Sequence, residues 1–204
     1  MKINKKKFIY LISPNYISNQ FYEDLKKVLN TGKVSFFQMR LKKYSFKQKT
    51  LIGKKIFQIC KKNDVKFLVN DDPLLTKKLN ADGCHLGQKD TDIIEAGKTL
   101  GNKIIGITCH NSIKIAKNAI KNQANYLAFG AFFSSQTKKA KFKATTKILN
   151  KVKKLTKIPI VAIGGINTTN YKKLLLNNAN LLAISGYVWN NKKYKPFETI
   201  EKIK

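Results

Sequence analysis

The sequence predicts an α/β protein built as a single (β/α)₈ barrel, a TIM barrel, over residues 1–204. Three observations support this prediction: short apolar runs recur at fairly even spacing, polar segments with helical periodicity separate them, and eight such runs fit into 204 residues. The runs show little alternation of apolar and polar residues, which indicates strands covered on both faces, as in a parallel sheet. An open doubly wound sheet is the alternative, but no G-x-G-x-x-G motif opens an early helix.

The eight runs are the predicted strands, in chain order. They are FIYLIS (8–13), VSFFQMRL (34–41), VKFLVN (65–70), GCHLG (83–87), IIGITC (104–109), YLAFGAFF (126–133), PIVAIGGI (159–166) and LLAISGYV (181–188). Segments such as 45–63 and 111–123 carry apolar residues three and four positions apart, which predicts amphipathic helices. A barrel of this kind carries its active site at the C-terminal ends of its strands, often with a phosphate site after strands seven and eight. We therefore expect the functional residues at those ends of the runs.

The charge balance is strongly basic, with 41 Lys plus Arg against 11 Asp plus Glu and a formal net charge of +30. Such a charge can indicate a nucleic-acid-binding protein. The lysines, however, are spread over the whole chain, and arginine, which nucleic-acid surfaces favour, occurs only once. We therefore expect no nucleic-acid partner, and a basic nucleic-acid-binding protein remains the alternative. In either case the positive field would concentrate anionic small molecules.

Hydropathy and cysteine usage suggest a compartment. No stretch approaches the roughly 20 apolar residues of a membrane span, and the apolar run near the N-terminus stops at Pro14, too early for a secretion signal. Cys60, Cys84 and Cys109 are an odd number of cysteines, which favours reduced thiols. These features predict a cytoplasmic protein without a membrane partner. A homo-oligomer is compatible with the sequence, which does not determine the oligomeric state.

The second run ends in a Q-x-R-x-K pattern formed by Gln38, Arg40 and Lys42. A strand points alternate side chains to the same face, so we expect these three side chains to lie together. Arg40 is the only arginine in the chain. Its guanidinium can bind phosphate or carboxylate oxygens through two parallel hydrogen bonds, which lysine cannot do. The pattern predicts an anion site at this strand end, and a surface arginine without a role is the alternative.

Six of the 11 acidic residues lie in the segment that includes the ends of the third and fourth runs. Asp72 and Asp92 are predicted to cap helices, and Asp82 to belong to the turn before the fourth strand. Asp71 and Asp90 follow neighbouring strands, so they should meet at the same rim of the barrel. Two carboxylates that face one gap repel each other unless a cation joins them. Mg²⁺ fits this pair, because it takes one or two carboxylates together with substrate phosphate oxygens.

The later loops offer further groups to an anion. The segment SSQTKKAKFKA (134–144) contains hydroxyls and lysines that could fold over an anion, and a solvated surface loop is the alternative. Gly164 and Gly165 lie at the end of the seventh run, and Ser185 and Gly186 follow the core of the eighth. Glycine lets backbone N–H groups approach an anion closely, and a following helix N-terminus adds partial positive charge. Glycines that only make tight turns are the alternative.

Taken together, these motifs resemble those of the thiamine-phosphate synthase family. The resemblance runs from YLIS to AISG and rests on five motifs in this order: QMRLK, VND…ADGCHLGQKD, IIGITCHN, FGAFF…QTKK and IPIVAIGGI. It implies a (β/α)₈ barrel and a transferase of thiamine biosynthesis with Mg²⁺ as its cofactor. The implied partners are two small molecules, an aminopyrimidine that carries a methyl diphosphate (hydroxymethylpyrimidine diphosphate) and a thiazole phosphate. The reaction joins them into thiamine phosphate and releases pyrophosphate.

The resemblance also implies a role for each matching residue. The diphosphate and metal ligands would come from runs two to four: Gln38, Arg40, Lys42 and Asn70 for the diphosphate, Asp71 and Asp90 for Mg²⁺. The remaining substrate ligands would come from the later loops: Thr108, Ser135, Thr137 and Lys138, with Gly165, Ile184 and Ser185 for the thiazole phosphate. Arg40, Thr108 and Lys138 would be catalytic. Thr108 stands where the family usually has serine, and Ser134-Ser135 replaces the usual Pro-Thr, which bears on rate more than on reaction type.

The nearest alternative is the related thiazole tautomerase, a barrel enzyme that binds the thiazole phosphate but needs neither diphosphate nor metal. His110 would suit its proton transfers. The synthase is favoured by Asn70-Asp71, by Asp90 and by Thr137-Lys138, because a tautomerase has no use for a site that holds a diphosphate and a metal.

The arginine hypothesis leads to a prediction. We expect Arg40→Lys to lower turnover more than roughly tenfold, because lysine cannot form the two parallel hydrogen bonds of arginine. This corresponds to a loss of at least about 1.4 kcal/mol of transition-state stabilisation. Lys43→Arg, three positions along, is the matched control and should change turnover little. Steady-state kinetics of the two variants checks this, and near-normal turnover in Arg40→Lys would contradict the hypothesis.

Overall fold

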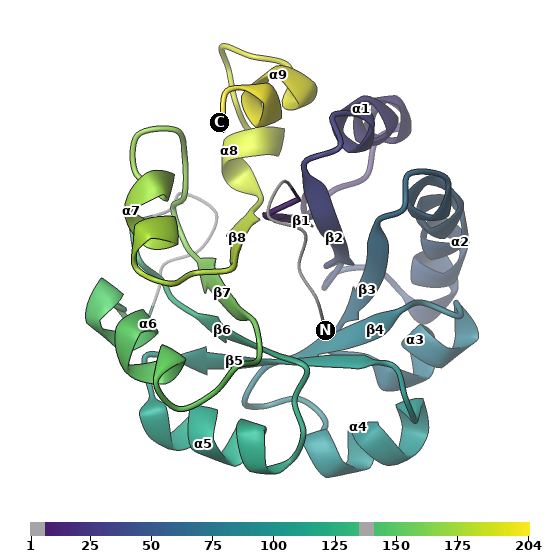
Figure 1. Cartoon of the computed structure of the whole chain (residues 1–204). Helices are drawn as coiled ribbons and strands as arrows, with labels where there is room; N and C mark the ends of the chain where they lie inside the picture. Colours follow the sequence, from purple (N-terminus) through teal and green to yellow (C-terminus); the bar gives the residue numbers. More distant parts are fainter. Residues whose placement is uncertain (1–6, 135–140) are drawn as a thin grey trace.

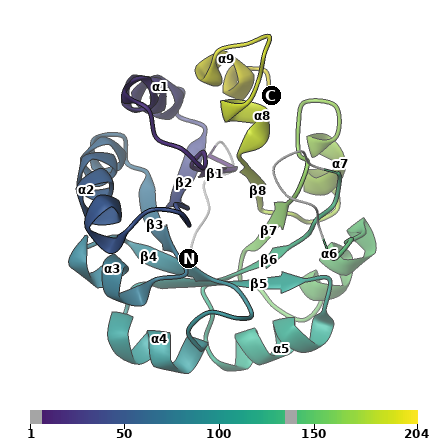
Figure 2. The same cartoon turned by 180° about the vertical axis from the view of Figure 1, so that it is seen from behind.

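The computed structural model describes residues 7–134 and 141–204. Within these residues eight parallel strands pair in chain order, and β8 pairs with β1 to close the barrel. The helices lie around the outside of the strands, as both views along the barrel show (Figures 1 and 2). The predicted (β/α)₈ barrel is therefore confirmed.

The elements alternate along the chain as the sequence predicts. The strands are β1 (Ile9–Ile12), β2 (Val34–Met39), β3 (Lys66–Asn70), β4 (Gly83–Leu86), β5 (Ile104–His110), β6 (Tyr126–Phe129), β7 (Ile160–Ile163) and β8 (Leu181–Ile184). The helices are α1 (Asn19–Asn30), α2 (Phe46–Lys62), α3 (Pro73–Lys78), α4 (Ile93–Leu100), α5 (Ile113–Lys121), α6 (Thr146–Lys153), α7 (Tyr171–Leu176), α8 (Gly186–Trp189) and α9 (Pro196–Glu201).

Several predicted strands extend too far in the sequence-based assignment, and the sixth and eighth do so most. The sixth run was expected to reach residue 133, but β6 ends at Phe129. The eighth was expected to reach residue 188, but β8 ends at Ile184 and the chain turns into α8. The backbone N–H groups of Val188 and Trp189 donate to the carbonyl of Ser185, at 2.9 and 3.0 Å. Apolar residues pack equally well from a short helix, so the apolar pattern alone did not separate the two structures.

The helices predicted at 45–63 and 111–123 form as α2 and α5. Ser45 and Gln48 make a reciprocal capping box at the start of α2, and the Ser112 hydroxyl caps α5. Asp72 and Asp92 cap α3 and α4 by accepting backbone N–H bonds of 2.9 and 2.8 Å, so both predicted acidic caps are confirmed.

Buried apolar residues fill two separate regions. Along β1, Ile9 and Leu11 pack in the layer between the strands and the helices, whereas Tyr10 and Ile12 belong to a second cluster. Because successive strand residues point to opposite faces, this second cluster is the barrel interior. Its rings include Tyr10 and Tyr126, whose centroids lie 5.8 Å apart. The barrel interior is a packed core, as in other TIM barrels.

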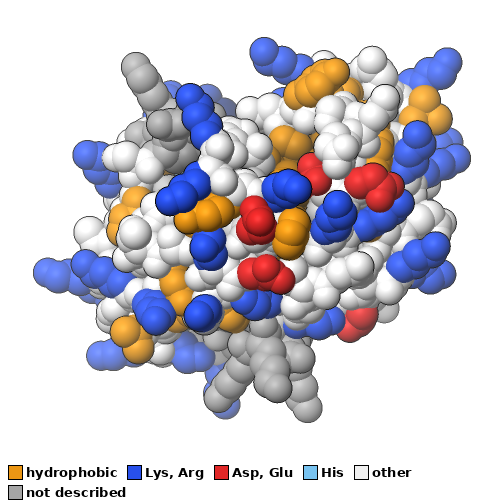
Figure 3. Space-filling view, turned by 90° about the horizontal axis from the view of Figure 1, so that it is seen from above, with side chains coloured by type: hydrophobic (Ala, Val, Ile, Leu, Met, Phe, Trp, Pro, Cys, Tyr) orange, Lys and Arg blue, Asp and Glu red, His pale blue; other side chains and the backbone are white. Residues whose placement is uncertain are grey.

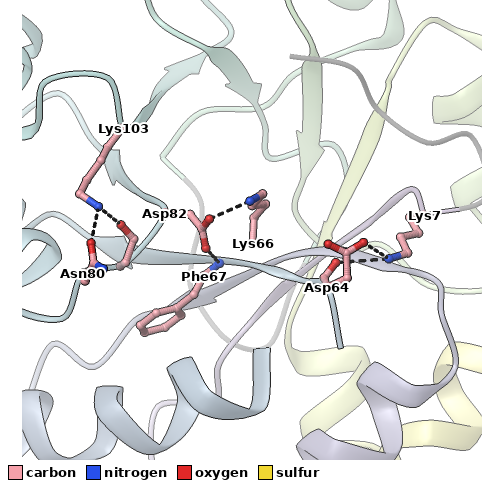
Figure 4. A network of polar contacts seen from close by, with 8 residues as sticks. Lys7, Asp64, Lys66, Phe67, Asn80, Asp82 and Lys103 are labelled. Atoms are coloured by element: carbon pink, nitrogen blue, oxygen red, sulfur yellow. Dashed lines mark hydrogen bonds and ion pairs between the residues drawn. The ribbon is translucent and has the colours of Figure 1, made fainter. Parts of the chain in front are cut away.

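Polar contacts tie together the N-terminal ends of the strands (Figure 4). Asp82, just before β4, accepts the backbone N–H of Phe67 at 2.9 Å and pairs with Lys66 at 2.9 Å. Lys103, just before β5, donates to the Ala81 carbonyl at 2.8 Å, and Lys7 pairs with Asp64 at 3.0 Å. The predicted turn role of Asp82 is confirmed. These contacts fix the end of the barrel that serves stability.

The charge on the face shown in Figure 3 is dispersed. In Figure 3, lysine and arginine side chains are scattered over the face shown, with acidic and uncharged side chains between them. This face therefore differs from the continuous basic stripe that tracks a phosphate backbone in nucleic-acid-binding proteins. Among the described residues, none of the helices combines the length and apolarity that crossing a bilayer requires.

Tight packing inside the barrel makes one glycine sensitive to substitution. Gly106 in β5 is paired with Tyr126 in β6, and a Cβ at Gly106 would lie 1.8 Å from Cζ of the buried ring. We expect Gly106→Ala to lower the free energy of unfolding by about 2 kcal/mol or more, because the ring must shift within a closed core.

Gly97 provides the matched control. It lies within α4, and a Cβ there would meet nothing within 4 Å. Gly97→Ala should raise the free energy of unfolding by about 0.5–1 kcal/mol through the better helix propensity of alanine. Urea unfolding of both variants measures the difference, and equal stabilities would show that the interior tolerates the added methyl group.

Candidate active site

The C-terminal ends of β2, β3 and β4 carry the predicted anion ligands. Gln38 lies within β2 and is buried, but the strand ends at Met39. The predicted strand therefore extends too far at its C-terminal end, because Arg40 and Lys42 stand in the loop that follows. This loop is held by the backbone N–H of Arg40, which donates to the Ser13 hydroxyl at 2.9 Å.

The two rim carboxylates meet as expected. Asp71 follows β3 with φ of 63°, and its N–H donates to the His85 carbonyl of β4 at 2.8 Å. Asp90 accepts the Gly87 N–H at 2.8 Å. Burial, together with a hydrogen bond to the Asp71 carboxyl, raises the pKa of Asp90. The structure thus brings together two acidic groups, and the charge of Asp71 disfavours the ionised form of Asp90.

Lysine partly compensates that charge. Lys42 Nζ lies 2.9 Å from Oδ2 of Asp71, and its charge also lowers the pKa of Asp90 against the larger effect of burial. A cleft of about 280 Å³ opens beside these groups, between the loops after β2 and β3. Its polar lining consists of Lys42, Lys49, Asn70, Asp71 and Asp72. A cleft lined by both signs of charge suits an anion that arrives with a cation.

The donor set fits magnesium better than a transition metal. The two neighbouring carboxylates are hard oxygen ligands, and Mg²⁺ usually takes one or two of these plus substrate phosphate oxygens and water. In the part of the chain that the structure describes, there is no cluster of three or more His, Cys, Asp or Glu side chains. The protein ligands alone therefore leave most of the coordination sphere to the substrate and water.

Polar side chains also line the barrel interior beneath this rim. Gln38 Nε2 donates to Oδ1 of Asn70, and Gln38 Oε1 accepts from Tyr10. His85 lies between Tyr126 and Thr108, with both hydrogen bonds at 2.8 Å.

Sequence reasoning missed Tyr10, His85 and Tyr126 as members of the site. The available signal was the position of each polar residue within an otherwise apolar strand. Because the structure closes the barrel, these three side chains lie together in its interior.

The later loops are partly described. Gly165 has φ of 61°, and a Cβ there would lie 2.3 Å from the Ser134 carbonyl, so the loop after β7 requires glycine. No helix starts directly after it, contrary to expectation, because α7 begins only at Tyr171. A helix does begin directly after Ser185, whose hydroxyl donates to the Ser13 carbonyl at 3.2 Å.

The other predicted site residues lie at strand ends or in the loop after β6. Ile184 is the buried last residue of β8. His110 ends β5 with φ of 54° and stacks on Phe142, with ring centroids 4.3 Å apart. Three predicted residues of the loop after β6 lie outside the described residues: Ser135, Thr137 and Lys138.

Burial of His85 makes folding pH-dependent. Burial lowers the pKa of His85 from 6.5 to about 4, the Asp90 charge opposes this shift and the Arg40 charge adds to it. Between these two pH values the unfolded chain binds a proton that the folded chain excludes, so this contribution to stability is complete above pH 6.5 and is lost as the pH falls toward 4. The slope is at most about 1.4 kcal/mol per pH unit.

The variant His85→Gln isolates this effect, because glutamine does not titrate. We expect the stability difference between the two proteins to change by up to about 3 kcal/mol, in favour of the natural chain, as the pH rises from 4 to 7. Urea unfolding across that range measures it. A constant difference would mean that His85 is not held neutral by burial.

Comparison with known proteins gives the family. A family model described as thiamine monophosphate synthase matches residues 9–188. The thiamine-phosphate synthase of Pelagibacter ubique is 65% identical over 207 residues and covers 100% of both chains, and that of Erythrobacter litoralis is 40% identical over 89% of this chain and 88% of its own. Among solved structures, thiamine phosphate pyrophosphorylase from Pyrococcus furiosus superposes with a TM-score of 0.86 at 28% identity, covering 98% of this chain and 94% of its own. The chain belongs to the thiamine monophosphate synthase family.

Proposed function

We propose that this protein joins hydroxymethylpyrimidine diphosphate to thiazole phosphate, forming thiamine phosphate and releasing pyrophosphate, with Mg²⁺ held by Asp71 and Asp90. The observation that carries this proposal is the meeting of these two carboxylates beside Lys42, at the rim where β2, β3 and β4 end. Family membership supports the reaction, and the geometry supports the location of the diphosphate.

The diphosphate would lie against the rim loops. Arg40 offers two parallel N–H donors and Lys42 an ammonium group, while the amide of Asn70 can donate an N–H to a phosphate oxygen. When bound, Mg²⁺ would neutralise the charge that develops on the departing diphosphate. The fixed cations of this chain act in the same direction, because they interact more strongly with the leaving group as its charge grows.

The bond changes need no protein nucleophile. The C–O bond between the pyrimidine methylene and the diphosphate breaks, and its electron pair leaves with the diphosphate. The thiazole nitrogen then donates its lone pair to the cationic methylene and forms the new C–N bond. Because His85 is neutral at pH 7, the barrel interior adds no imidazolium charge near that cation.

We also propose that the protein acts in the cytoplasm. Its three cysteines are free and buried, and burial raises the pKa of the Cys84 and Cys109 thiols to about 12. Such thiols are inert side chains of the core, in keeping with a reducing compartment.

Purified protein, both substrates and Mg²⁺ form the direct test, with pyrophosphate and thiamine phosphate as the measured products. EDTA should abolish the reaction, and added Mg²⁺ should restore it. Asp71→Asn and Asp90→Asn should each lower turnover at least roughly tenfold, because each removes a charged oxygen ligand.

Asp92→Asn is the matched control. It removes an acid from the same segment, but asparagine caps a helix as well as aspartate does, so turnover should be unchanged. If the protein released no pyrophosphate but isomerised the thiazole phosphate with EDTA present, the tautomerase alternative would be favoured instead, and normal turnover in both rim variants would refute the metal site.

A further inference from the structure

Six polar side chains, one from each of β1 to β6, form a continuous chain of hydrogen bonds through the barrel. The order is Asn70, Gln38, Tyr10, Tyr126, His85 and Thr108. The four inner members are buried, with exposed fractions between 0 and 9%, whereas Asn70 and Thr108 at the two ends are partly exposed. The chain therefore connects two points of the C-terminal rim through the interior.

Proton counting gives the first half of the chain a direction. Gln38 Nε2 donates to Asn70 Oδ1, so Gln38 turns its Oε1 toward Tyr10. That oxygen only accepts, and Tyr10 must therefore donate to it, at 2.9 Å. A phenol has one proton, so the 2.9 Å contact between the two tyrosine hydroxyls must use the proton of Tyr126.

The same counting fixes the second half. Because Tyr126 uses its hydroxyl proton in the hydrogen bond to Tyr10, its oxygen must accept a hydrogen bond from His85. His85 must therefore carry its proton on Nδ1. Nε2 of the neutral ring is then an acceptor, and the 2.8 Å contact to Thr108 uses the threonine proton. The oxygen lone pairs of Thr108 are what remains for a ligand.

The opposite direction of hydrogen bonding would satisfy every inner group equally well. It would require both amide groups to be flipped and each hydrogen bond to be donated by its other partner. What separates the two directions is Asn70, and this step rests on the proposed function. In the observed direction Asn70 keeps its amide N–H groups for the rim, where they can donate to a diphosphate. In the reversed direction its carbonyl oxygen would face the phosphate oxygens, which is repulsive.

We propose that Tyr10, Tyr126 and His85 are positioning residues: the chain they form holds His85 as the Nδ1–H tautomer and makes the Thr108 hydroxyl an acceptor toward the substrate. The complementary ligand group is an N–H donor on a heterocycle, such as the amino group of an aminopyrimidine. Buried groups of fixed direction discriminate strongly against a ligand with the wrong hydrogen-bonding pattern, because a mismatch leaves them unpaired.

Nitrogen-15 NMR of the labelled protein reads the tautomer directly. The chain contains only two histidines, so His110→Gln assigns the signals of His85. At pH 7.5, without ligand and with inorganic pyrophosphate plus Mg²⁺, we expect a neutral His85 protonated on Nδ1. A neutral ring protonated on Nε2, or a ring protonated on both nitrogens, would overturn the proposal.

Tyr10→Phe tests whether direction is transmitted. Tyr10 makes no hydrogen bond to His85. In the variant, however, Tyr126 has lost the Tyr10 oxygen as its acceptor and should donate its hydroxyl proton to Nδ1 of His85 instead. His85 should then become the Nε2–H tautomer. Tyr126→Phe, which deletes the partner of Nδ1, should give the same tautomer. The control is Tyr171→Phe, which removes the hydroxyl of another buried tyrosine. That hydroxyl is hydrogen-bonded to Lys204 and is not part of the hydrogen-bond network in the barrel. The tautomer should not change in this control.

Kinetics gives a second readout. Tyr10→Phe should lower kcat/KM for the pyrimidine diphosphate roughly 5- to 100-fold, the effect of reversing one buried hydrogen bond to the substrate, while binding of inorganic pyrophosphate with Mg²⁺ is retained. An unchanged His85 tautomer in a folded Tyr10→Phe variant would refute the transmission. If the natural protein shows the expected tautomer but makes no thiamine phosphate, the proposed function is refuted, whereas the proposed direction of the hydrogen bonds is supported.

Discussion

Closure of the parallel sheet is the constraint on which the rest of the structure depends. Backbone hydrogen bonds pair β8 with β1, so segments more than 170 residues apart become neighbours. The Ser13 segment after β1 then touches both sides of the rim: its hydroxyl accepts the Arg40 N–H, and its carbonyl accepts the Ser185 hydroxyl. Trp189 strengthens this junction by donating to the Ile12 carbonyl at 2.7 Å. One short segment therefore holds both the backbone of Arg40, the predicted anion ligand after β2, and the loop after β8.

Closure also creates an interior that must be filled. A wholly apolar interior would satisfy packing, yet Tyr10, Gln38, His85 and Tyr126 stand there, and burial raises the pKa of both tyrosines and lowers that of His85. Their hydrogen bonds offset the cost of burying polar groups, and in the described residues no buried side-chain nitrogen or oxygen lacks a partner. A satisfied network in a low-dielectric interior is rigid, which suits a site that must present a hydroxyl in one orientation.

The single arginine and the many lysines are best understood separately. Lysines scattered over the surface make the protein basic without forming a continuous stripe on the face in Figure 3. Arg40 occupies a half-buried position directly after β2, close enough to the barrel interior for its charge to lower the pKa of His85. Net charge attracts anions at long range, whereas the planar guanidinium can orient one at contact.

The sequence alone determined the barrel, because apolar runs and helical periodicity are local signals and eight repeats leave few ways to close a sheet. It also determined that Asp71 and Asp90 meet, since both follow adjacent parallel strands. It did not determine where β8 ends, because an apolar segment packs equally well as a strand or as the short helix α8.

Only the tertiary structure decided how the side chains work together. Strand alternation placed Gln38 in the barrel interior, whereas tertiary contacts hold the loop after β2: the Arg40 N–H donates to the Ser13 hydroxyl, and Lys42 pairs with Asp71. The link from Asn70 to Thr108 joins residues from six strands. Sequence patterns singled out Gln38, Asn70 and Thr108 but not Tyr10, His85 and Tyr126, and hydrogen-bond direction is a property of the closed network. Local pattern reveals which residues face inward, but only packing reveals which of them touch.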